Sequence, residues 1–568
     1  MEKAVVIHNY RKIIRKDGIE LILYDWNTEF DKATDMKDIM RKLLKSKGLN
    51  KESVQDFINF NIKKHSPFLF RDMKKAIDTI KKHKRIVIFG DYDCDGICAT
   101  TIMYIGLKQY GFDVSYDIPI REKHGYGVSI GRIDKYIVDG KPTIDCIITV
   151  DNGITCPKEC LYAKENGIDF IVTDHHLPGL ILPDCPIIDP YVDDYPCKYL
   201  CGALVALKFI SALFNEKMEE NFSTSIYREL IIIGMIATIS DCMKLQDENR
   251  VYVHEGLSYI PTCSNEGLKM ILELLDKNKL TATDVAFGIG PMMNATGRMK
   301  TASLGVELLL TDNIKEAEKL AKEIYELNEE RKLITTKVAD NLVVDDTAEF
   351  IIEKVENIPA GILGIIANKI ADKYQRPVFI VSEKGDNFGG SGRSVGKYSI
   401  YQCIQDNKDI MWGGGHAAAA GIGFKKANFE LVKKRCCEHF KKWKETHKEE
   451  DLKEGLTALC EVDFPLVTKR LISNIDKLEP YGEGNEAPLF ITRHCRVVKS
   501  KVVGKQKNTL QMTLEQNGTL IKVVGFQGMN ERYHDEEYVD IIYQLGLNEW
   551  PKNVYNIQLI LVDVQPSF

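Results

Sequence analysis

Short apolar runs alternate with stretches of helical spacing along residues 85–214. The apolar runs predict strands at Ile86–Phe89, Val114–Ile120, Cys146–Val150, Phe170–Thr173 and Pro186–Ile188. Helices are predicted between them, near residues 97–110, 129–138, 156–166 and 200–214, and apolar helices follow at 228–240 and 265–276. This β–α alternation is typical of a parallel, doubly wound sheet.

A polar stretch with a single apolar stripe comes next. Residues 313–344 contain no proline, and the stripe runs from Ile314 to Leu327 at helical spacing, which predicts one long helix. Such a helix could connect two domains as a rigid strut or pack against one domain. A second α/β block follows at 347–445, with strands at Phe350–Val355 and Val378–Val381 around a helix at 362–373.

The C-terminal part of the chain changes to short strands. They are predicted at Arg496–Val503, Thr509–Glu515, Thr519–Gly525, Val539–Leu545 and Asn556–Val562. Asn517-Gly518 lies between two of them and is a strong hairpin signal. Short strands at this density predict a small closed β-barrel of the OB type over 455–568, after a charged linker at Lys444–Glu454.

Composition sets limits on the class of protein. The 568 residues exceed one hydrophobic core, and 44% hydrophobic with 28% charged residues is ordinary for a globular protein. The net charge of -6 means that any nucleic-acid surface must be a local basic patch. Residues 1–84 are charged, helical in spacing, and lead into the first α/β domain at 85–312, which is followed by the connecting helix at 313–346.

Fifteen cysteines without a Cys-x-x-Cys pair indicate free thiols in a reducing compartment rather than a zinc site. Residues 1–12 lack the apolar region of a signal peptide, and the longest apolar run, Leu230–Ile239, is too short to span a bilayer. We therefore expect a soluble, cytoplasmic protein that acts away from membranes.

Acidic side chains follow three of the predicted strands and one apolar helix. Because the carboxyl ends of parallel strands meet at one edge of a sheet, these groups should face one crevice. Crowded carboxylates repel unless a cation neutralises them, and such a set with an imidazole suits two Mn²⁺ or Mg²⁺ ions that share a carboxylate. An isolated carboxylate here could simply cap a helix. The residues concerned are Asp91, Asp93, Asp151, Asp174, His175, His176 and Asp241.

Three glycine-rich stretches could hold phosphate. Gly413–His416 precedes Ala417–Ala420, which predicts a helix start whose N–H groups bind phosphate, with His416 against the scissile group. Gly389–Ser394 and Asn294–Arg298 are predicted as two further tight loops that carry arginine. Each could also be a plain turn. No G-x-x-x-x-G-K-[ST] sequence is present, so we expect no nucleotide cofactor.

These motifs together resemble a known superfamily. Gly90–Gly96 (GDYDCDG), Val150–Gly153 (VDNG), Thr173–His176 (TDHH) and Ile239–Asp241 (ISD) resemble the four motifs of the DHH phosphoesterase superfamily. Gly389–Ser394 (GGSGRS) and residues 412–421 (WGGGHAAAAG) are similar to motifs of its DHHA1 partner domain. The long helix, the barrel and the Glu479–Asn485 segment are similar to the superfamily members that degrade single-stranded DNA.

The resemblance implies specific roles. The metal ligands would be Asp91, Asp93, Asp151, His175 and Asp241. Asp151 would bridge, with Asp91 on one metal and the remaining three on the other. Asp174 and His176 would lie behind the ligands or against the substrate, and His176 and His416 would join the catalytic group. Asp95 would only shape the turn and cap a helix. Val87 stands where the pyrophosphatases of the superfamily have histidine, which leaves the first metal site rich in oxygen.

The resemblance implies the contacts with the 5′ phosphate, and the basic and glycine-rich stretches themselves suggest further DNA contacts. Arg298, Ser391 and Arg393 would hold the 5′ phosphate, Gly414, Gly415 and His416 would contact phosphate, and Arg121 with Gly125–Gly127 would track the strand. In the barrel, stacking and charge would come from Tyr481, Phe490, Arg496, Lys499, Lys501, Lys505 and Lys507.

The expected function is a metal-dependent 5′→3′ exonuclease that hydrolyses single-stranded DNA to 5′-mononucleotides by a two-metal mechanism, in DNA repair and recombination. By resemblance, a helicase and a single-strand-binding protein would be partners of a monomeric enzyme. One alternative is an oligoribonuclease or cyclic-dinucleotide phosphodiesterase. Another is a non-catalytic scaffold, which should have lost metal ligands that this chain retains.

Overall fold

The computed structural model describes residues 5–567, except 8, 15–19, 26–30, 121–126, 278–279, 346, 453–455, 505–508, 527–528, 530–532, 534–535 and 549–555. The chain forms two compact units. One consists of residues 62–446 and 482–484, and the other of residues 1–61, 447–481 and 485–568. Among the described residues, no helix combines the length and the hydropathy that a membrane span requires.

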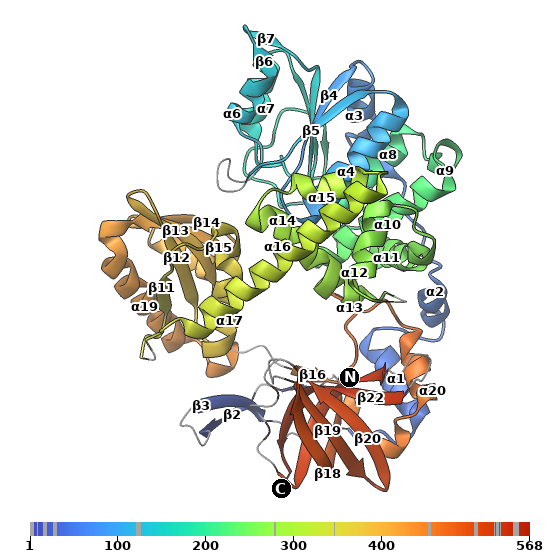
Figure 1. Cartoon of the computed structure of the whole chain (residues 1–568), viewed down its shortest axis with the longest axis vertical. Coiled ribbons are helices and arrows are strands. Elements are labelled where there is room, and N and C mark those ends of the chain that lie inside the picture. The colour runs from blue at the N-terminus through green and yellow to red at the C-terminus, as the bar shows by residue number, and fades with distance from the viewer. Residues whose placement is uncertain are drawn as a thin grey trace. The chain divides into compact units, whose positions relative to one another are not determined.

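A five-stranded parallel sheet forms the centre of the first unit, as predicted (Figure 1). Its strand order is β10-β9-β8-β4-β5. The strands are β4 (Arg85–Phe89), β5 (Asp113–Asp117), β8 (Cys146–Val150), β9 (Asp169–Thr173) and β10 (Ile187–Ile188). Alternate residues enter two cores, because side chains alternate across a strand: Ile86 and Ile88 join one core, and Val87 and Phe89 join the other.

Helices cover both faces of this sheet. Ile86 and Ile88 face α4 (Cys94–Tyr110) and α8 (Gly202–Leu213), whereas Val87 and Phe89 face α6 (Ile130–Ile133) and α7 (Pro157–Glu165). The other helices are α3 (Met73–Ile80), α9 (Met218–Asn221), α10 (Thr224–Ser240), α11 (Asp247–Tyr259), α12 (Glu266–Leu274), α13 (Ala282–Asp284), α14 (Gly290–Met299) and α15 (Ser303–Leu310).

The helix predicted at 129–138 is shorter than expected. After α6 the chain forms a small hairpin from β6 (Ile137–Val138) and β7 (Lys141–Pro142). Asp139 and Gly140 between them both have positive φ, at 50° and 72°, which is the backbone of a two-residue hairpin turn.

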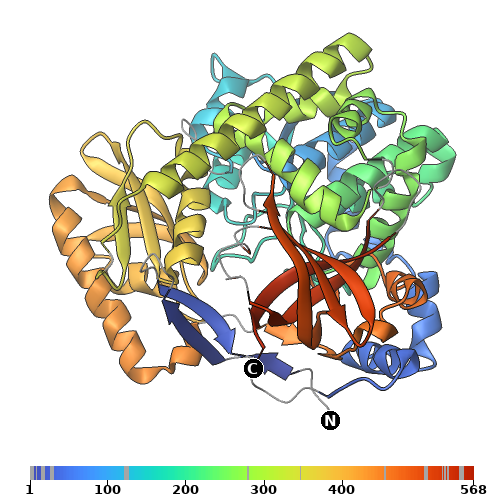
Figure 2. The same cartoon turned by 60° about the horizontal axis from the view of Figure 1, so that its bottom comes forward.

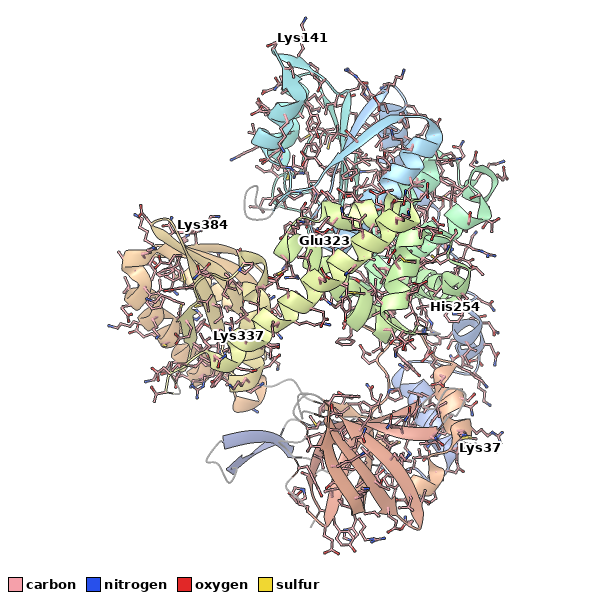
Figure 3. All side chains as sticks on the ribbon, in the orientation of Figure 1. Lys37, Lys141, His254, Glu323, Lys337 and Lys384 are labelled. Atoms are coloured by element: carbon pink, nitrogen blue, oxygen red, sulfur yellow. The ribbon has the colours of Figure 1, made fainter. Side chains whose placement is uncertain are left out.

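The long helix is α16 (Ile314–Asn341), capped by the Asn313 side chain. Figure 3 labels Glu323 and Lys337 along it. Glu323 pairs with Lys300 at 2.6 Å, and Lys369 of the following α/β block donates to Thr336 of the helix at 2.9 Å. The helix therefore packs against both the parallel-sheet part and the second α/β block, as a connecting strut does.

The second α/β block has a mixed sheet in the order β11-β12-β13-β15-β14. Its strands are β11 (Ile351–Lys354), β12 (Val378–Lys384), β13 (Asn387–Arg393), β14 (Met411–Gly415) and β15 (Ala419–Lys425). Helices α17 (Leu363–Tyr374) and α19 (Phe429–Thr446) lie on opposite faces of the sheet (Figures 1 and 2), and α18 (Ile400–Asp406) precedes β14.

The second unit contains the expected closed five-stranded barrel. Its strands are β18 (Phe490–Val503), β19 (Thr509–Gln516), β20 (Thr519–Gly525), β21 (Tyr538–Asn548) and β22 (Asn556–Pro566). β18 pairs with both β19 and β21, which closes the ring, and β17 (Cys460–Glu461) adds to β18. The helix α20 (Lys469–Asp476) precedes the barrel.

Residues 1–61 belong to the barrel unit, whereas the sequence placed them in a region leading into the first α/β domain. β1 (Val5–Ile7) pairs with β16 (Leu456–Ala458), and Ile39 and Leu43 of α1 (Met36–Ser46) enter the barrel core. The other elements of this segment are β2 (Asn9–Ile14), β3 (Glu20–Asp25) and α2 (Ser53–Asn59). The pairing joins segments at opposite ends of the chain, so local pattern could not reveal it.

Candidate metal centre

Three neighbouring strand ends build the centre. β4, β8 and β9 lie side by side, and Asp91, Asp151 and Asp174 follow their carboxyl ends. The backbone of Asp151 has a positive φ of 59°, a conformation that a non-glycine residue adopts only at a cost, and its N–H donates to the Thr173 carbonyl at 3.1 Å. The expected convergence of these strand ends is present in the fold.

The ligand atoms form three overlapping groups, in each of which they lie within 4.8 Å of one another. The groups are Asp91, Asp93 and Asp151; Asp95, His175 and Asp241; and Asp151, His175 and His176. Asp151 occurs in two groups, which fits a carboxylate shared between two ions. Asp93 groups with Asp91 and Asp151, however, and not with His175 and Asp241 as predicted.

The geometry fits coordination better than internal hydrogen bonding. Nε2 of His175 lies 3.0 Å from Oδ1 of Asp151, yet this oxygen and Oδ1 of Asp91 are buried without a hydrogen-bond partner among the described residues. Adjacent ligands of an octahedral ion with bonds of about 2.1 Å are about 3 Å apart. Nε2 of His175 is also 3.7 Å from Oδ2 of Asp241. These side chains therefore fit Mg²⁺ or Mn²⁺.

Burial makes the cluster unfavourable without a cation. Burial, followed by the neighbouring carboxylates, raises the pKa of Asp91 and Asp151 well above the ordinary value for aspartate. The same causes raise the pKa of Asp241 to about 8. Burial lowers the pKa of His175, which keeps its imidazole in the neutral form that binds metals. A divalent cation would remove the electrostatic cost of ionising the carboxylates.

Asp174 and His176 form a separate ionic pair beside this cluster. Oδ1 of Asp174 accepts from Nδ1 of His176 at 2.8 Å, and Oδ2 accepts from the Ile154 N–H at 2.9 Å. Burial opposes the charge of His176, but the bond to Asp174 outweighs it and raises the pKa of His176 to about 9. Burial likewise opposes the charge of Asp174, but the bond from His176 holds its pKa below the ordinary value. His176 is therefore protonated at neutral pH, and Asp174 holds its positive charge beside the cluster.

Asp95 caps a helix, as predicted, but it does more than shape its own turn. Asp93 is the N-cap that accepts from the Gly96 N–H at 3.0 Å, so α4 begins at Cys94 and Asp95 lies inside its first turn. The buried Asp95 carboxylate accepts from the N–H groups of Gly202 and Ala203, at 2.6 and 2.8 Å, and thereby caps α8. Its Oδ2 is also 3.5 Å from Nε2 of His175. Asp95 thus joins two helices and borders the centre.

Close packing fixes the ligand-bearing turns, and sequence reasoning missed the residues responsible. A Cβ at Gly202 would lie 2.6 Å from Cβ and 2.9 Å from Oδ1 of Asp151. Asn294 of α14 accepts from the Cys94 N–H at 2.9 Å, and a Cβ at Gly297 would lie 2.0 Å from the Tyr92 carbonyl oxygen. The predicted loop at 294–298 is therefore a helix, whose glycine lets it approach the first motif. Spacing in the sequence carried no signal for these contacts.

Arg298, Ser391 and Arg393 gather at the start of α17. Arg298 donates to the Gly361 carbonyl at 3.1 Å. A Cβ at Gly364 would lie 2.9 Å from Oγ of Ser391 and 3.2 Å from Nη2 of Arg393. Ser391 and Arg393 lie on strand β13 rather than on the predicted tight loop. The structure brings these three predicted residues together although Arg298 is distant from the other two in the chain.

The helix start predicted after His416 is wrong. Residues 411–425 form the β14–β15 hairpin, and the His416 N–H donates to the Ala419 carbonyl at 2.8 Å. Gly414 and Gly415 lie on β14, and His416 is exposed in the loop. Alanine is a good helix former in isolation, but Ala419 and Ala420 pair with β13, and strand pairing outweighs their propensity.

Other predicted DNA contacts differ in outcome. Phe490 is 1% exposed in the barrel core and so cannot stack on a base. Tyr481 is half-buried, donates to the Ile475 carbonyl at 2.6 Å and lies beneath Lys47. Arg496, Lys499 and Lys501 are exposed on β18. Arg121, Gly125, Tyr126, Lys505 and Lys507 lie outside the described residues.

Three family models match the chain. They describe the DHH family N-terminal domain over residues 85–235, the DHHA1 domain over 347–442 and the RecJ OB domain over 460–563. The first two contain the motifs on which the resemblance was based, except Ile239–Asp241, and the third covers the barrel.

Curated relatives match over most of the chain. The single-stranded-DNA-specific exonuclease RecJ of Salmonella typhimurium is 31% identical over 86% of this chain and 89% of that protein. The same-named protein of Bacillus subtilis is 31% identical over 89% of this chain, which spans 64% of that longer relative. A crystal structure of RecJ with Mn²⁺ from Thermus thermophilus matches with a TM-score of 0.79 and 26% identity, over 94% of this chain and 77% of that one.

Proposed function

The chain belongs to the RecJ family of single-stranded-DNA-specific exonucleases, and from this premise we propose that it is a metal-dependent enzyme that removes 5′-mononucleotides from single-stranded DNA in the 5′→3′ direction. One observation carries the proposal. The adjacent ends of β4, β8 and β9 bring buried carboxylates together with His175, and the described residues around them supply too few positive charges to neutralise these carboxylates.

Two Mn²⁺ or Mg²⁺ ions would be held by Asp91, Asp93, Asp151, His175 and Asp241, with Asp151 shared between them. When bound, such ions supply Lewis acidity at the scissile phosphate and lower the pKa of a water. Asp95 keeps His175 and the start of α8 in place behind them.

His176 would act on the substrate itself. Its pKa of about 9 keeps it protonated at neutral pH, and Asp174 fixes its Nδ1. The imidazolium can donate a hydrogen bond to a non-bridging phosphate oxygen or a proton to the departing 3′ oxygen. His416, on the exposed β14–β15 loop, would contact the same phosphate once a strand is bound.

Polarity would come from the 5′ phosphate. Ser391 and Arg393 border the N-terminal end of α17, and Arg298 is bonded to the turn before that helix. Helix N-termini and guanidinium groups both favour phosphate dianions. A strand whose terminal phosphate is held there would present its first phosphodiester for cleavage, so the 5′ end would be degraded first.

The barrel would bind the single strand farther from its end. Lys499 of β18 is in register with Thr513 of β19, and Thr513 with Lys522 of β20, so the two exposed lysines belong to one row across the sheet. Lys501 lies two residues from Lys499 on the same exposed strand. Such a row suits a phosphate backbone, and Lys522 adds a cation that sequence reasoning missed.

The cellular setting is part of the proposal. All fifteen cysteines are free thiols, which is compatible with a reducing cytoplasm. The enzyme would act as a monomer in DNA repair and recombination, with a helicase to open duplexes and a single-strand-binding protein to hold its substrate.

A substrate panel tests this function. Labelled single strands with a 5′ phosphate, a 5′ hydroxyl or a blocked 5′ end, together with short RNA and cyclic dinucleotides, would be digested with Mn²⁺ and with Mg²⁺. We expect 5′-mononucleotides from the unblocked DNA strands. Preference for short RNA or cyclic dinucleotides, or unchanged digestion of blocked strands, would overturn the proposal.

Asp151→Ala is the diagnostic variant, and it should lose nearly all hydrolysis while still binding single strands. Asp169→Ala is its matched control, because Asp169 lies at the opposite, amino end of β9 and pairs with His83. Full activity in Asp151→Ala would contradict the metal assignment.

A further inference from the structure

Trp412 is a large aromatic side chain in an exposed position that the proposed reaction does not use. It lies on β14, the edge strand of the second α/β sheet, and is 52% exposed. A Cβ at Gly423 would lie 2.4 Å from Nε1 and 2.6 Å from Cε2 of Trp412, so one side of the indole rests on the backbone of the neighbouring strand. The exposed area of the side chain therefore lies mainly on the other side of the indole.

The register places Trp412 on the same sheet face as the predicted phosphate ligands. Trp412 pairs with Gly423, and Gly423 pairs with Gly389 of β13. Ser391 and Arg393 are two and four residues from Gly389, and therefore point to the same side. The opposite face carries Phe388 and Phe424, which contact Phe429 of α19.

Only part of this face is covered by a helix. The start of α17 lies over Ser391 and Arg393, as the contacts of Gly364 indicate. Around Gly389 and Gly414, a Cβ would meet no described atom within 4 Å. Because adjacent strands are about 4.8 Å apart, β14 is about 10 Å from β13, and Trp412 borders the uncovered part of the face.

We propose that Trp412 stacks on a base of the DNA strand whose 5′ phosphate is held by Ser391 and Arg393. The tryptophan carries this proposal, and the neighbouring glycines only explain why a base can reach its ring. Isolated exposed aromatics are common, but this one shares a sheet face with a serine and an arginine suited to phosphate. Stacking on any base would add affinity without sequence preference, as an exonuclease requires. The inference rests on the proposed function and deepens it.

Abasic probes test the stacking directly. Short 5′-phosphorylated oligothymidylates, intact or with one abasic site at each of the first positions in turn, would be bound to the protein in EDTA, which prevents hydrolysis. In the wild type, we expect one abasic position to weaken binding by roughly 5- to 150-fold, the range for a stacked base. Trp412→Ala should weaken binding of the intact strand similarly and abolish the abasic penalty, and Trp412→Phe should retain most of both.

Tryptophan fluorescence gives a second readout. DNA binding should quench the emission of the wild type, and Trp412→Phe should lose that quenching. Trp443→Phe is the matched control and should retain it, because Trp443 is half-buried on α19, stacked on Phe440 and in edge contact with Tyr398. Circular dichroism would establish that each variant is folded.

The outcomes separate the two proposals. If the wild type neither binds nor cleaves single strands, the proposed function and the stacking site both fail. If the wild type cleaves 5′-phosphorylated strands normally and Trp412→Ala keeps the wild-type affinity and abasic penalty, only the stacking site is refuted.

Discussion

Replacing Asp95 with asparagine should destabilise the catalytic part of the protein even when no metal is bound. The two oxygens of this buried carboxylate each accept one N–H at the start of α8, from Gly202 and Ala203. Asparagine retains one acceptor and places an amide donor against the other N–H. A buried donor left without an acceptor costs about 1–3 kcal/mol, and the lost charge at a helix N-terminus costs up to about 2 kcal/mol.

Relief of electrostatic repulsion offsets part of this loss. Burial raises the pKa of Asp95, and Asp93 adds repulsion, so removing the charge returns some free energy. A net destabilisation of about 2 kcal/mol follows from these terms. For the compact unit of residues 62–446 and 482–484 it corresponds to a fall of about 2–3 °C in melting temperature.

Asp93→Asn is the matched control, two residues away. Asp93 also makes a cap, to Gly96, but asparagine caps a helix about as well as aspartate. In EDTA it should melt within about 1 °C of the wild type, although we expect it to lose hydrolysis when metal is supplied. Differential scanning calorimetry in EDTA at neutral pH measures both variants and resolves separate transitions. If Asp95→Asn melts with the wild type, or Asp93→Asn falls as far, Asp95 is not the clamp between α4 and α8.

Three further results are expected. Gly202→Ala should weaken Mn²⁺ binding about 10- to 100-fold in calorimetric titration, because its Cβ would displace Asp151, and wild-type affinity would contradict this packing. In EDTA, the melting temperature should fall as pH rises from about 6 to about 8. The pKa of Asp241 is about 8 in the folded state, far above its ordinary value of 3.8. The folded state therefore binds the proton of Asp241 more tightly than the unfolded state does, and this contribution to stability is lost as the pH rises through the window. Mn²⁺ should flatten that dependence, and an equal slope with and without Mn²⁺ would argue against Asp241 as a ligand. Arg393→Lys should lower the ratio of initial rates on 5′-phosphate and 5′-hydroxyl strands about tenfold, because lysine cannot form a bidentate bond, and an unchanged ratio would remove Arg393 from the phosphate site.

The predicted metal ligands depended on a regularity that local sequence can carry. A strand followed by an acidic turn recurs at Asp91, Asp151 and Asp174, and parallel strands place such turns at one edge of the sheet. Each strand with the turn after it is a short, contiguous segment, so local sequence was nearly sufficient to propose these ligands. The pattern could not show that Asp95 caps the distant helix α8 or that it borders the centre.

The glycine-rich stretches failed for the opposite reason. Glycine usually signals a turn, and on this basis loops were predicted at residues 294–298 and 389–394. In the fold, these glycines lie in a helix and a strand, where a Cβ at Gly297 would meet the Tyr92 carbonyl oxygen at 2.0 Å and one at Gly390 would meet the Ile380 carbonyl oxygen at 2.2 Å. They are required by neighbours on other elements, which no local pattern reveals.

Periodicity and the succession of strands and turns are local properties, so the amino-acid sequence was enough to predict the parallel sheet, the order of its acidic turns and the barrel. Contacts in the fold were needed to show which carboxylate caps which helix, that residues 1–61 join the barrel, and that Arg298, Ser391 and Arg393, which only the resemblance had grouped, meet at α17. These features depend on contacts between segments that are distant in the chain, and such contacts form only when the chain packs.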